Sequence, residues 1–264
     1  MPISAMSEYF STNSGAIQFK QSQLTHWNAH LKKLHSPEEI IKWAILTFDN
    51  IYQISALGIS GLSIIHLLSE KFTDEKIDCV FIDTLHHFPQ TLDLVDKIQK
   101  KYYNKNVISD FHVIKPLGLE SEKEFSDKYG DNLWISDDDK YDYFSKVEPL
   151  ERTYKQFNID LVITGRRQTQ GNDRTDLDIL EYDALNKVFK LNPFYNYTFK
   201  QVHDIVIEGD VPTNELLQYG YKSIGDYHST LPTVGDDERG GRWSDKKGKT
   251  ECGIHQPERF SKFK

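Results

Sequence analysis

One cysteine of this 264-residue chain lies in a setting that could make it a nucleophile. Cys252 follows a segment rich in Arg, Gly and Lys, residues 239–249, and His255 stands three residues after it. Nearby cations favour the thiolate, which is the reactive form of the side chain. The other cysteine, Cys79, falls in an apolar stretch typical of a buried strand, where a thiol behaves as a small apolar group. The pattern predicts covalent sulfur chemistry at Cys252.

Two segments that follow predicted strands contain residues suited to a nucleotide. The turn at residues 55–63 is built of small residues, whose backbone amides can approach a phosphate at a helix N-terminus. It lacks the Gly-Lys-Ser/Thr of a Walker loop, and an ordinary tight turn explains it equally well. Asp83 and Thr84 follow the next strand, where a side chain can reach a base or a ribose. His86 and His87 are adjacent and point in different directions, so we expect no metal pair there.

A third segment supplies cations. Gly165 permits a sharp exit from a predicted strand, and Arg166, Arg167 and Arg174 follow it. The planar guanidinium groups suit phosphate or sulfate oxygens, so we expect these arginines to face a ligand. Lys146 precedes a predicted helix, a position where a lysine is usually just solvated.

Strands and helices alternate along most of the chain. The predicted strands are 51–57, 78–82, 111–115 and 159–164, with a hairpin of 178–182 and 187–191. The predicted helices are 23–34, 36–47, 60–71, 88–103, 121–129, 147–157 and 198–208, and residues 137–141 are predicted to be a polar loop. Such alternation predicts an α/β fold with a doubly wound, mainly parallel sheet and a ligand crevice beyond the carboxyl ends of its strands.

The chain divides into three parts by composition. We expect residues 1–20 to be a flexible extension, residues 21–228 to form the α/β domain, and residues 229–264 to form an irregular, mobile C-terminal segment that carries Cys252. Residues 239–264 hold eight basic and three acidic side chains, whereas the whole chain has a net charge of −8. A cationic segment beside an acidic body predicts closure over a bound anion, and a solvated, disordered end is the alternative.

Composition excludes several classes of protein. The net charge argues against general nucleic-acid binding. No apolar run approaches the roughly 18 residues that span a bilayer, and the N-terminus lacks a secretory signal. Two cysteines cannot staple a secreted protein of this size, so we expect a reducing, cytoplasmic location and no membrane association.

Six motifs, in order along the chain, resemble those of the sulfonucleotide reductases, specifically the thioredoxin-dependent 3′-phosphoadenylyl-sulfate reductases and their fungal branch. They are Asp83-Thr84 with Phe88-Pro89, Lys146-Val147-Glu148-Pro149, Gly165-Arg166-Arg167, Ser223-Ile224-Gly225-Asp226-Tyr227-His228, Glu238-Arg239-Gly240-Gly241-Arg242-Trp243 and Glu251-Cys252-Gly253-Ile254-His255. The turn at 55–63 also resembles that of the adenine-nucleotide alpha-hydrolase superfamily. It lacks the acidic residue of the ATP pyrophosphatases, since Leu62 and Ser63 follow Ser60-Gly61.

The resemblance implies a fold of the alpha-hydrolase type and an oxidoreductase of sulfate assimilation. Its members convert 3′-phosphoadenylyl sulfate to sulfite and adenosine 3′,5′-bisphosphate, usually as homodimers. The residue matching Cys252 attacks the sulfur to form S-sulfocysteine, and thioredoxin then releases sulfite. Positions matching Lys146, Arg239, Arg242 and His255 contact the sulfate and phosphate groups. The candidate substrate-binding residues are therefore Ser55, Gly58, Ser60, Gly61, Asp83, Thr84, Lys146, Gly165, Arg166, Arg167, Arg174, His228, Arg239, Arg242 and His255.

Cysteine usage bears on cofactors. Relatives that reduce adenylyl sulfate carry an iron–sulfur cluster, with a cysteine pair just before the motif that begins at Lys146. Residues 142–145 contain no cysteine, and two cysteines cannot hold a four-cysteine cluster, so we expect no metal and no bound cofactor. Reducing sulfate to sulfite takes two thiols, and the second must come from another protein because the chain has no Cys-x-x-Cys.

Two other functions are compatible with parts of the pattern. An ATP pyrophosphatase or adenylyltransferase on the same fold would depend on ATP and magnesium, and would carry the missing acidic residue in the turn at 55–63. An inactive nucleotide-binding redox sensor would use Cys252 without turnover. Sulfite formation from the sulfonucleotide with reduced thioredoxin would exclude the sensor.

Overall fold

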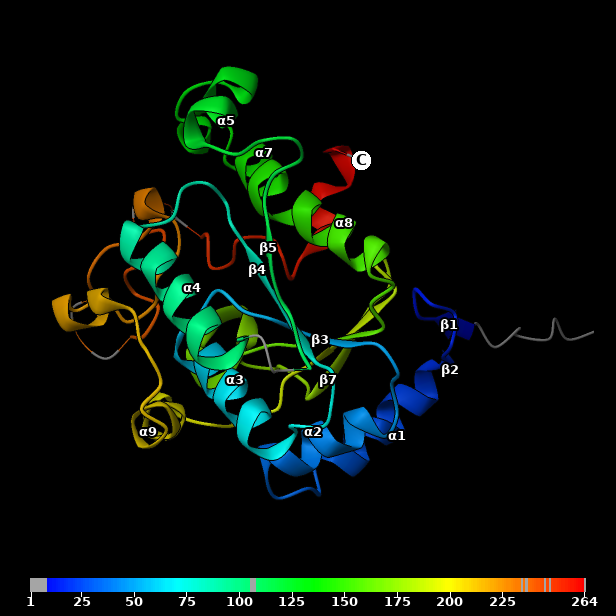
Figure 1. Ribbon diagram of the computed structural model, residues 1–264. Coiled ribbons are helices and arrows are strands. Elements are labelled where there is room, and N and C mark those ends of the chain that lie inside the picture. Colours follow the sequence, from blue (N-terminus) through cyan, green and yellow to red (C-terminus); the bar gives the residue numbers. More distant parts are fainter. Residues whose placement is uncertain are drawn as a thin grey trace, which may run out of the picture.

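A six-stranded sheet in the order β5-β4-β3-β6-β8-β7 forms the centre of the computed structural model (Figure 1). The structure describes residues 9–104, 108–233, 235, 237–244, 246 and 248–263. The strands are β3 (Ile51–Ile54), β4 (Asp78–Ile82), β5 (Phe111–Ile114), β6 (Leu161–Ile163), β7 (Leu180–Asp183) and β8 (Val188–Leu191). All neighbours pair in parallel except β7, which runs antiparallel to β8 as the predicted hairpin requires. The doubly wound, mainly parallel sheet is therefore confirmed.

Alternate strand residues fill two separate cores, because successive side chains of a strand point to opposite faces. Cys79 and Phe81 of β4 join the larger core. Val80 packs instead into the smaller core, with Leu150 and Tyr154. Figure 1 shows α3, α4 and α9 on one side of the sheet and α8 on the other. Helices on both faces leave the ends of the strands as the accessible place for a ligand.

The helices begin close to the predicted capping residues. They are α1 (Gln21–Leu31), α2 (Pro37–Ile45), α3 (Ile59–Lys71), α4 (Pro89–Tyr102), α5 (Glu122–Tyr129), α6 (Leu133–Ser136), α7 (Asp138–Asp142), α8 (Glu148–Gln156) and α9 (Phe199–Glu208). Short 3₁₀ helices cover Gln168–Gln170, Asn172–Arg174, Glu215–Tyr219, Tyr227–Ser229 and Pro257–Phe263. Ser36 caps α2 by accepting a hydrogen bond from the Glu39 N–H, and Thr198 with Gln201 forms a capping box at α9.

The predicted polar loop at residues 137–141 is wrong. Asp137 caps α7 by accepting a hydrogen bond from the Lys140 N–H at 3.0 Å. The helix then continues through a π-helical turn, Tyr143–Val147, directly into α8. Tertiary burial overrides the polar sequence here, because Tyr141 and Asp142 are both buried. Lys146 consequently lies within a π-helical turn rather than ahead of a helix.

Residues 9–20 also differ from the expected flexible extension, whose first eight residues lie outside the described part of the chain. Strands β1 (Tyr9–Ser11) and β2 (Gln18–Lys20) form a hairpin. Phe19 of β2 is fully buried and packs edge-on to Tyr182 at 4.8 Å. This hairpin is ordered because its aromatic side chains are buried against residues of the sheet that lie far along the chain. The local sequence does not reveal such contacts.

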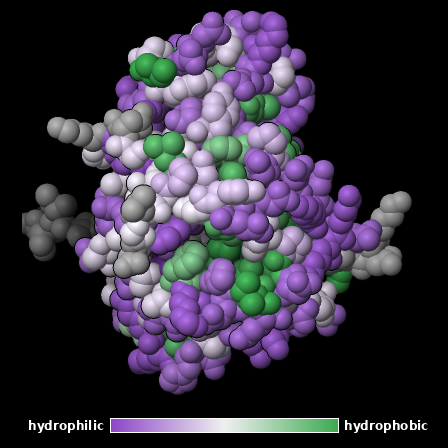
Figure 2. Space-filling view, turned by 90° about the vertical axis from the view of Figure 1, so that its left-hand side faces the viewer, coloured by the Kyte–Doolittle hydropathy of each residue, from purple (hydrophilic) through white to green (hydrophobic). Residues whose placement is uncertain are grey.

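The C-terminal segment, residues 229–264, is irregular as expected where it is described, apart from its 3₁₀ helices. Figure 1 shows its chain running from the region beside α4 and α9 across the molecule toward α8. The face over α4 and α9 is mainly hydrophilic, with hydrophobic residues in small separate groups (Figure 2). Among the described residues, no helix combines the length and apolar character that crossing a bilayer requires.

Candidate functional site: a thiol in a cationic cavity

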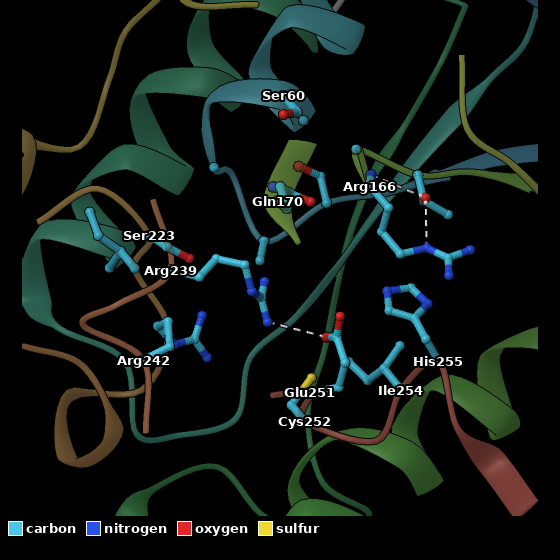
Figure 3. Close-up of a pocket in the computed structure, with 18 of the residues that line it drawn as sticks. Ser60, Arg166, Gln170, Ser223, Arg239, Arg242, Glu251, Cys252, Ile254 and His255 are labelled. Atoms are coloured by element: carbon cyan, nitrogen blue, oxygen red, sulfur yellow. Dashed lines mark hydrogen bonds and ion pairs between the residues drawn. The ribbon is translucent and has the colours of Figure 1, made fainter. Parts of the chain in front are cut away.

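A cavity of about 230 Å³ lies beyond the carboxyl ends of the central strands. Its lining comes from the ends of β3 and β6, the N-terminus of α3, and the C-terminal segment. In Figure 3, Ser60 and Arg166 lie on one side of this space, and Arg242 and Cys252 lie across from them. The predicted crevice and the predicted nucleophile therefore meet at one place.

The structure brings most of the candidate residues to this cavity. Those that line it are Ser55, Gly58, Ser60, Gly61, Thr84, Lys146, Gly165, Arg166, Arg174, Arg239, Arg242, Cys252 and His255. Three candidates do not line it: Asp83, Arg167 and His228.

The turn after β3 is shaped by close backbone contacts. Ser55 Oγ accepts a hydrogen bond from the Leu57 N–H at 3.0 Å. A Cβ on Gly61 would lie 2.2 Å from that Ser55 oxygen, and a Cβ on Gly165 would lie 3.0 Å from the Gly61 nitrogen. Both glycines are thus needed for the turn and the loop after β6 to approach each other, leaving the start of α3 open to an anion.

Arg167 lies outside the cavity because it is fully buried behind the turn. Its Nε donates to Ser60 Oγ at 2.8 Å, and its Nη2 pairs with Glu238 Oε1 at 2.7 Å. The side chain therefore joins the start of α3 to the C-terminal segment. The predicted contact of Arg167 with the substrate is therefore not seen. Its N–H groups donate to other residues of the protein and so stabilise the turn.

Asp83 and His228 are likewise turned to other partners. Asp83 Oδ1 accepts from the Leu85 N–H at 2.9 Å, which shapes the loop after β4. His228 stacks on Trp134 with ring centroids 4.2 Å apart. Burial lowers the pKa of His228 to about 3, with Lys146 adding to the effect and Asp226 opposing it. The residue is a neutral part of the packing rather than a cation at the ligand.

Buried neutral histidines make stability depend on pH. His228 is the clearest case, and the pKa values of His86 and His255 are also lowered, in each case chiefly by burial. As pH falls below about 6.5 the unfolded chain takes up these protons first, so the stability present above that pH is lost. For His228 alone, the free energy of unfolding should fall by up to about 2 kcal/mol between pH 6.5 and pH 5.

Urea unfolding at pH 7.5, 6.5 and 5.0 measures this loss. His228→Gln should give a shallower decrease than the original chain, since it removes one of the protonating groups. A free energy of unfolding that stays constant from pH 7.5 to pH 5.0 would contradict the burial of neutral histidines.

Lys146 is a buried cation held between two carboxylates. Its Nζ lies 2.7 Å from Asp142 Oδ1 and 2.7 Å from Asp226 Oδ2. Burial alone would lower its pKa, but Asp142 and Asp226, with a smaller contribution from Cys252, raise it above the ordinary value. Asp226 also accepts from Thr84 Oγ1 at 2.6 Å. The ammonium group is thus fixed in its charged form at the cavity wall.

The arginines of the cavity outnumber the carboxylates that pair with them. Glu251 pairs with Arg174, whose Nη2 lies 2.8 Å from Oε2, and with Arg239 at 3.3 Å. Arg166 pairs with Glu181. Burial and Arg174 lower the pKa of Arg239 to about 10, against the effect of Glu251, so it remains charged at neutral pH. The cavity therefore has an excess of positive charge.

Arg242 differs from these arginines because no described carboxylate lies within ion-pair distance of it. Its guanidinium group stacks over Trp243, 4.3 Å from the ring centroid, and its buried Nε has no described hydrogen-bond partner. A Cβ on Gly225 would lie 2.3 Å from its Nη2, so a larger residue there would displace the guanidinium group. The arrangement leaves the charge of Arg242 available to a ligand.

Cys252 is half-buried at the wall of the cavity. The next residue, Gly253, has φ +83°, and a Cβ there would lie 2.2 Å from the Phe260 ring. Phe260 is fully buried beside Tyr143 and Val147. The turn at Gly253 and the anchor at Phe260 together explain why glycine follows the cysteine and how the thiol is directed to the cavity.

Several residues that line the cavity were not among the substrate-binding candidates predicted from the sequence. They include His87, Gln170, Lys222, Ser223, Ile224, Asp226, Glu238, Trp243 and Glu251. The three acidic ones stand inside the motifs already quoted. Charge balance is the signal that could have found them, because buried cations need buried carboxylates as partners.

Comparisons with known proteins agree with this geometry. Residues 50–232 match the family model of the phosphoadenosine phosphosulfate reductase domain. The chain is 54% identical over 248 residues to the phosphoadenosine phosphosulfate reductase of Saccharomyces cerevisiae, covering 92% of this chain and 93% of that protein. The crystal structure of the phosphoadenylyl-sulfate reductase from Candida auris, in a phosphate complex, superposes with a TM-score of 0.74 at 45% identity, covering 82% of this chain and 100% of that one.

A more distant structure shares the fold alone. The FMN adenylyltransferase of Candida glabrata superposes with a TM-score of 0.51 at 16% identity, over 69% of this chain and 57% of that one. This likeness shows a shared fold and does not extend to chemistry.

Proposed function

This chain belongs to the phosphoadenosine phosphosulfate reductase family, and from that premise we propose that it reduces 3′-phosphoadenylyl sulfate to sulfite and adenosine 3′,5′-bisphosphate in sulfate assimilation. The observation that carries the proposal is the half-buried thiol of Cys252 at the wall of a cation-lined cavity. Such a site suits a nucleotide that carries several negative charges and an electrophilic sulfur atom.

The cavity divides the binding of the anion between two parts of the chain. Lys146, Arg166 and Arg174 belong to the α/β domain, while Arg239 and Arg242 arrive with the C-terminal segment. The turn at residues 55–61 would receive a phosphate at the start of α3. A bound anion would draw Arg174 and Arg239 toward it, and these two share Glu251 in the structure. His255, whose pKa burial holds well below its usual range, would serve as a neutral hydrogen-bond partner.

The chemistry follows from the placement of the thiolate. Its electron pair attacks the sulfate sulfur, the bond from sulfur to the phosphate oxygen breaks, and the bisphosphate leaves as an anion. Cys252 then carries an SO₃ group as S-sulfocysteine. Lys146 and Arg242 would neutralise the repulsion between thiolate and sulfate oxygens, and would stabilise the charge that develops on the leaving group.

A dithiol reductant must complete the cycle. One of its thiolates attacks Cys252 Sγ and expels sulfite, and its second thiol then resolves the mixed disulfide and restores the Cys252 thiolate. We assign this role to cytoplasmic thioredoxin and expect the enzyme to be a homodimer, both from the family resemblance. The C-terminal segment would open to admit the reductant. The absence of a bound cofactor stays a prediction, based on the two cysteines of the sequence.

Intact-mass analysis tests the reaction class and the nucleophile together. The reduced protein is mixed with 3′-phosphoadenylyl sulfate without a reductant, and peptide mapping locates any added mass. We expect one SO₃ group per chain on Cys252, removed as sulfite when thioredoxin is added. A protein that stays unmodified, or one that binds iron and loses turnover when the iron is removed, would contradict the proposal.

A further inference from the structure

A cluster of ion pairs joins the C-terminal segment to a single helix, α7. Three aspartates, Asp138, Asp139 and Asp142, receive four basic side chains of the segment. These side chains are Lys246, Lys249, Arg259 and Lys262. The segment that carries Cys252 is thus held on both sides of the thiol by the same helix.

The pairs differ in burial, and burial decides how much each contributes. Lys262 lies 3.0 Å from Asp139, and their side chains are 59% and 26% exposed. An exposed pair of this kind is screened by salt and contributes little. The side chains of Lys249 and Asp142 are only 6% and 0% exposed. A buried charge left without its partner is strongly unfavourable, so the Lys249–Asp142 pair is the anchor that matters.

Asp142 uses its two oxygens for two different lysines. Oδ1 lies 2.7 Å from Lys146 Nζ, which lines the cavity, and Oδ2 pairs with Lys249. Lys249 stands three residues before Cys252 in the chain. The carboxylate of Asp142 therefore links Lys146 at the cavity wall to the segment that carries the thiol.

We propose that Asp142 is a positioning residue for sulfur transfer, an inference that rests on the proposed function. It fixes Lys249, and with it the backbone leading to Cys252, relative to Lys146. Without this link Lys146 keeps its pair with Asp226, so the anion cavity stays cationic, whereas Lys249 keeps only its pair with Asp138, whose side chain is 25% exposed. We therefore expect the loss of Asp142 to lower the fraction of time that the Cys252 thiol is docked at the cavity, rather than the affinity for the anion.

Lys249→Met tests the anchor from the side of the irregular segment. We expect kcat to fall about tenfold or more, since small misplacements of a reacting group are costly, and KM for the sulfonucleotide to change by less than about twofold. Alkylation of Cys252 by iodoacetamide should become faster. Loss of a nearby cation alone would slow alkylation by disfavouring the thiolate, so acceleration reports undocking.

Three further variants sharpen the test. Lys249→Arg keeps the pair with Asp142 and should restore both readouts. Lys262→Met removes the exposed pair with Asp139 and a contact with the Phe263 ring, and it should leave both readouts unchanged. Asp142→Asn should follow Lys249→Met in kcat and alkylation, while binding adenosine 3′,5′-bisphosphate at least as tightly as the original chain.

The inference is overturned if Lys249→Met alkylates and turns over like the original chain, or if Lys262→Met has the same effect. A raised KM with unchanged kcat would also overturn it, because Lys249 would then act on the substrate directly. Should Asp142→Asn fail to fold, the lysine variants still decide. Alkylation needs no turnover, so a chain that makes no sulfite would reject the proposed function and leave the anchor testable.

Discussion

Cys252→Ser is expected to form no measurable sulfite while still binding adenosine 3′,5′-bisphosphate. A serine hydroxyl at neutral pH is a far weaker nucleophile than a thiolate, and it cannot form a sulfur–sulfur bond that a dithiol reductant could cleave. We expect turnover to fall at least about 10⁴-fold. The cations of the cavity remain in place, so the affinity for the bisphosphate, measured by calorimetry, should change little.

Cys79→Ala is the matched control for that variant. Cys79 is fully buried in β4, and burial raises the pKa of its thiol to about 12, with a hydrogen bond from Tyr103 partly opposing the shift. It is therefore inert at neutral pH. The variant should keep turnover and lose only some stability from the small cavity. Substantial sulfite formation by Cys252→Ser, or its loss in Cys79→Ala, would show that the nucleophile is misassigned.

Arg242→Ala is expected to lower kcat/KM for the sulfonucleotide by about 10²- to 10³-fold, the range seen when one hydrogen-bond donor to a developing negative charge is removed. We expect a large effect because no described carboxylate lies within ion-pair distance of Arg242, so its charge is available to the substrate. Its loss should weaken anion binding and also slow attack on the sulfur. Steady-state sulfite release and single-turnover formation of the adduct separate these two effects.

Two controls accompany that prediction. Arg242→Lys keeps the charge but not the planar group that stacks over Trp243, so it should recover only part of the rate. Arg259→Ala removes an arginine of the same segment that pairs with Asp139 outside the cavity, and it should have a small effect. If Arg242→Ala changed only the preference for the base, its assigned role at the sulfate would be wrong.

Much of the fold could be predicted from the sequence because its signals are local. The apolar run at residues 78–82 became β4 with the same limits, and the capping residues Ser36 and Thr198 gave the starts of two helices. The hairpin formed by β1 and β2 could not be predicted in this way, since its order depends on the burial of Phe19 against residues far along the chain.

The candidate site shows the same division. Most of the cations that line the cavity, and Cys252, follow strand ends or stand in motifs, so their types and order were enough to predict them; Lys222 was missed. The partner of each cation could not be predicted in this way. Arg167 was predicted to contact the ligand, but it binds Glu238 and Ser60 instead. Which buried acid meets which base depends on three-dimensional packing.

The π-helical turn at Tyr143–Val147 limits how this part of the gene can vary in length. A π-helical turn closes its hydrogen bonds over one more residue than an α-helical turn, so deleting a single codon in it would change the directions in which its side chains face. Val147 must pack against Phe260, and Leu150 must face the smaller core, while Lys146 faces the cavity. Substitutions can therefore accumulate in this stretch more readily than insertions or deletions.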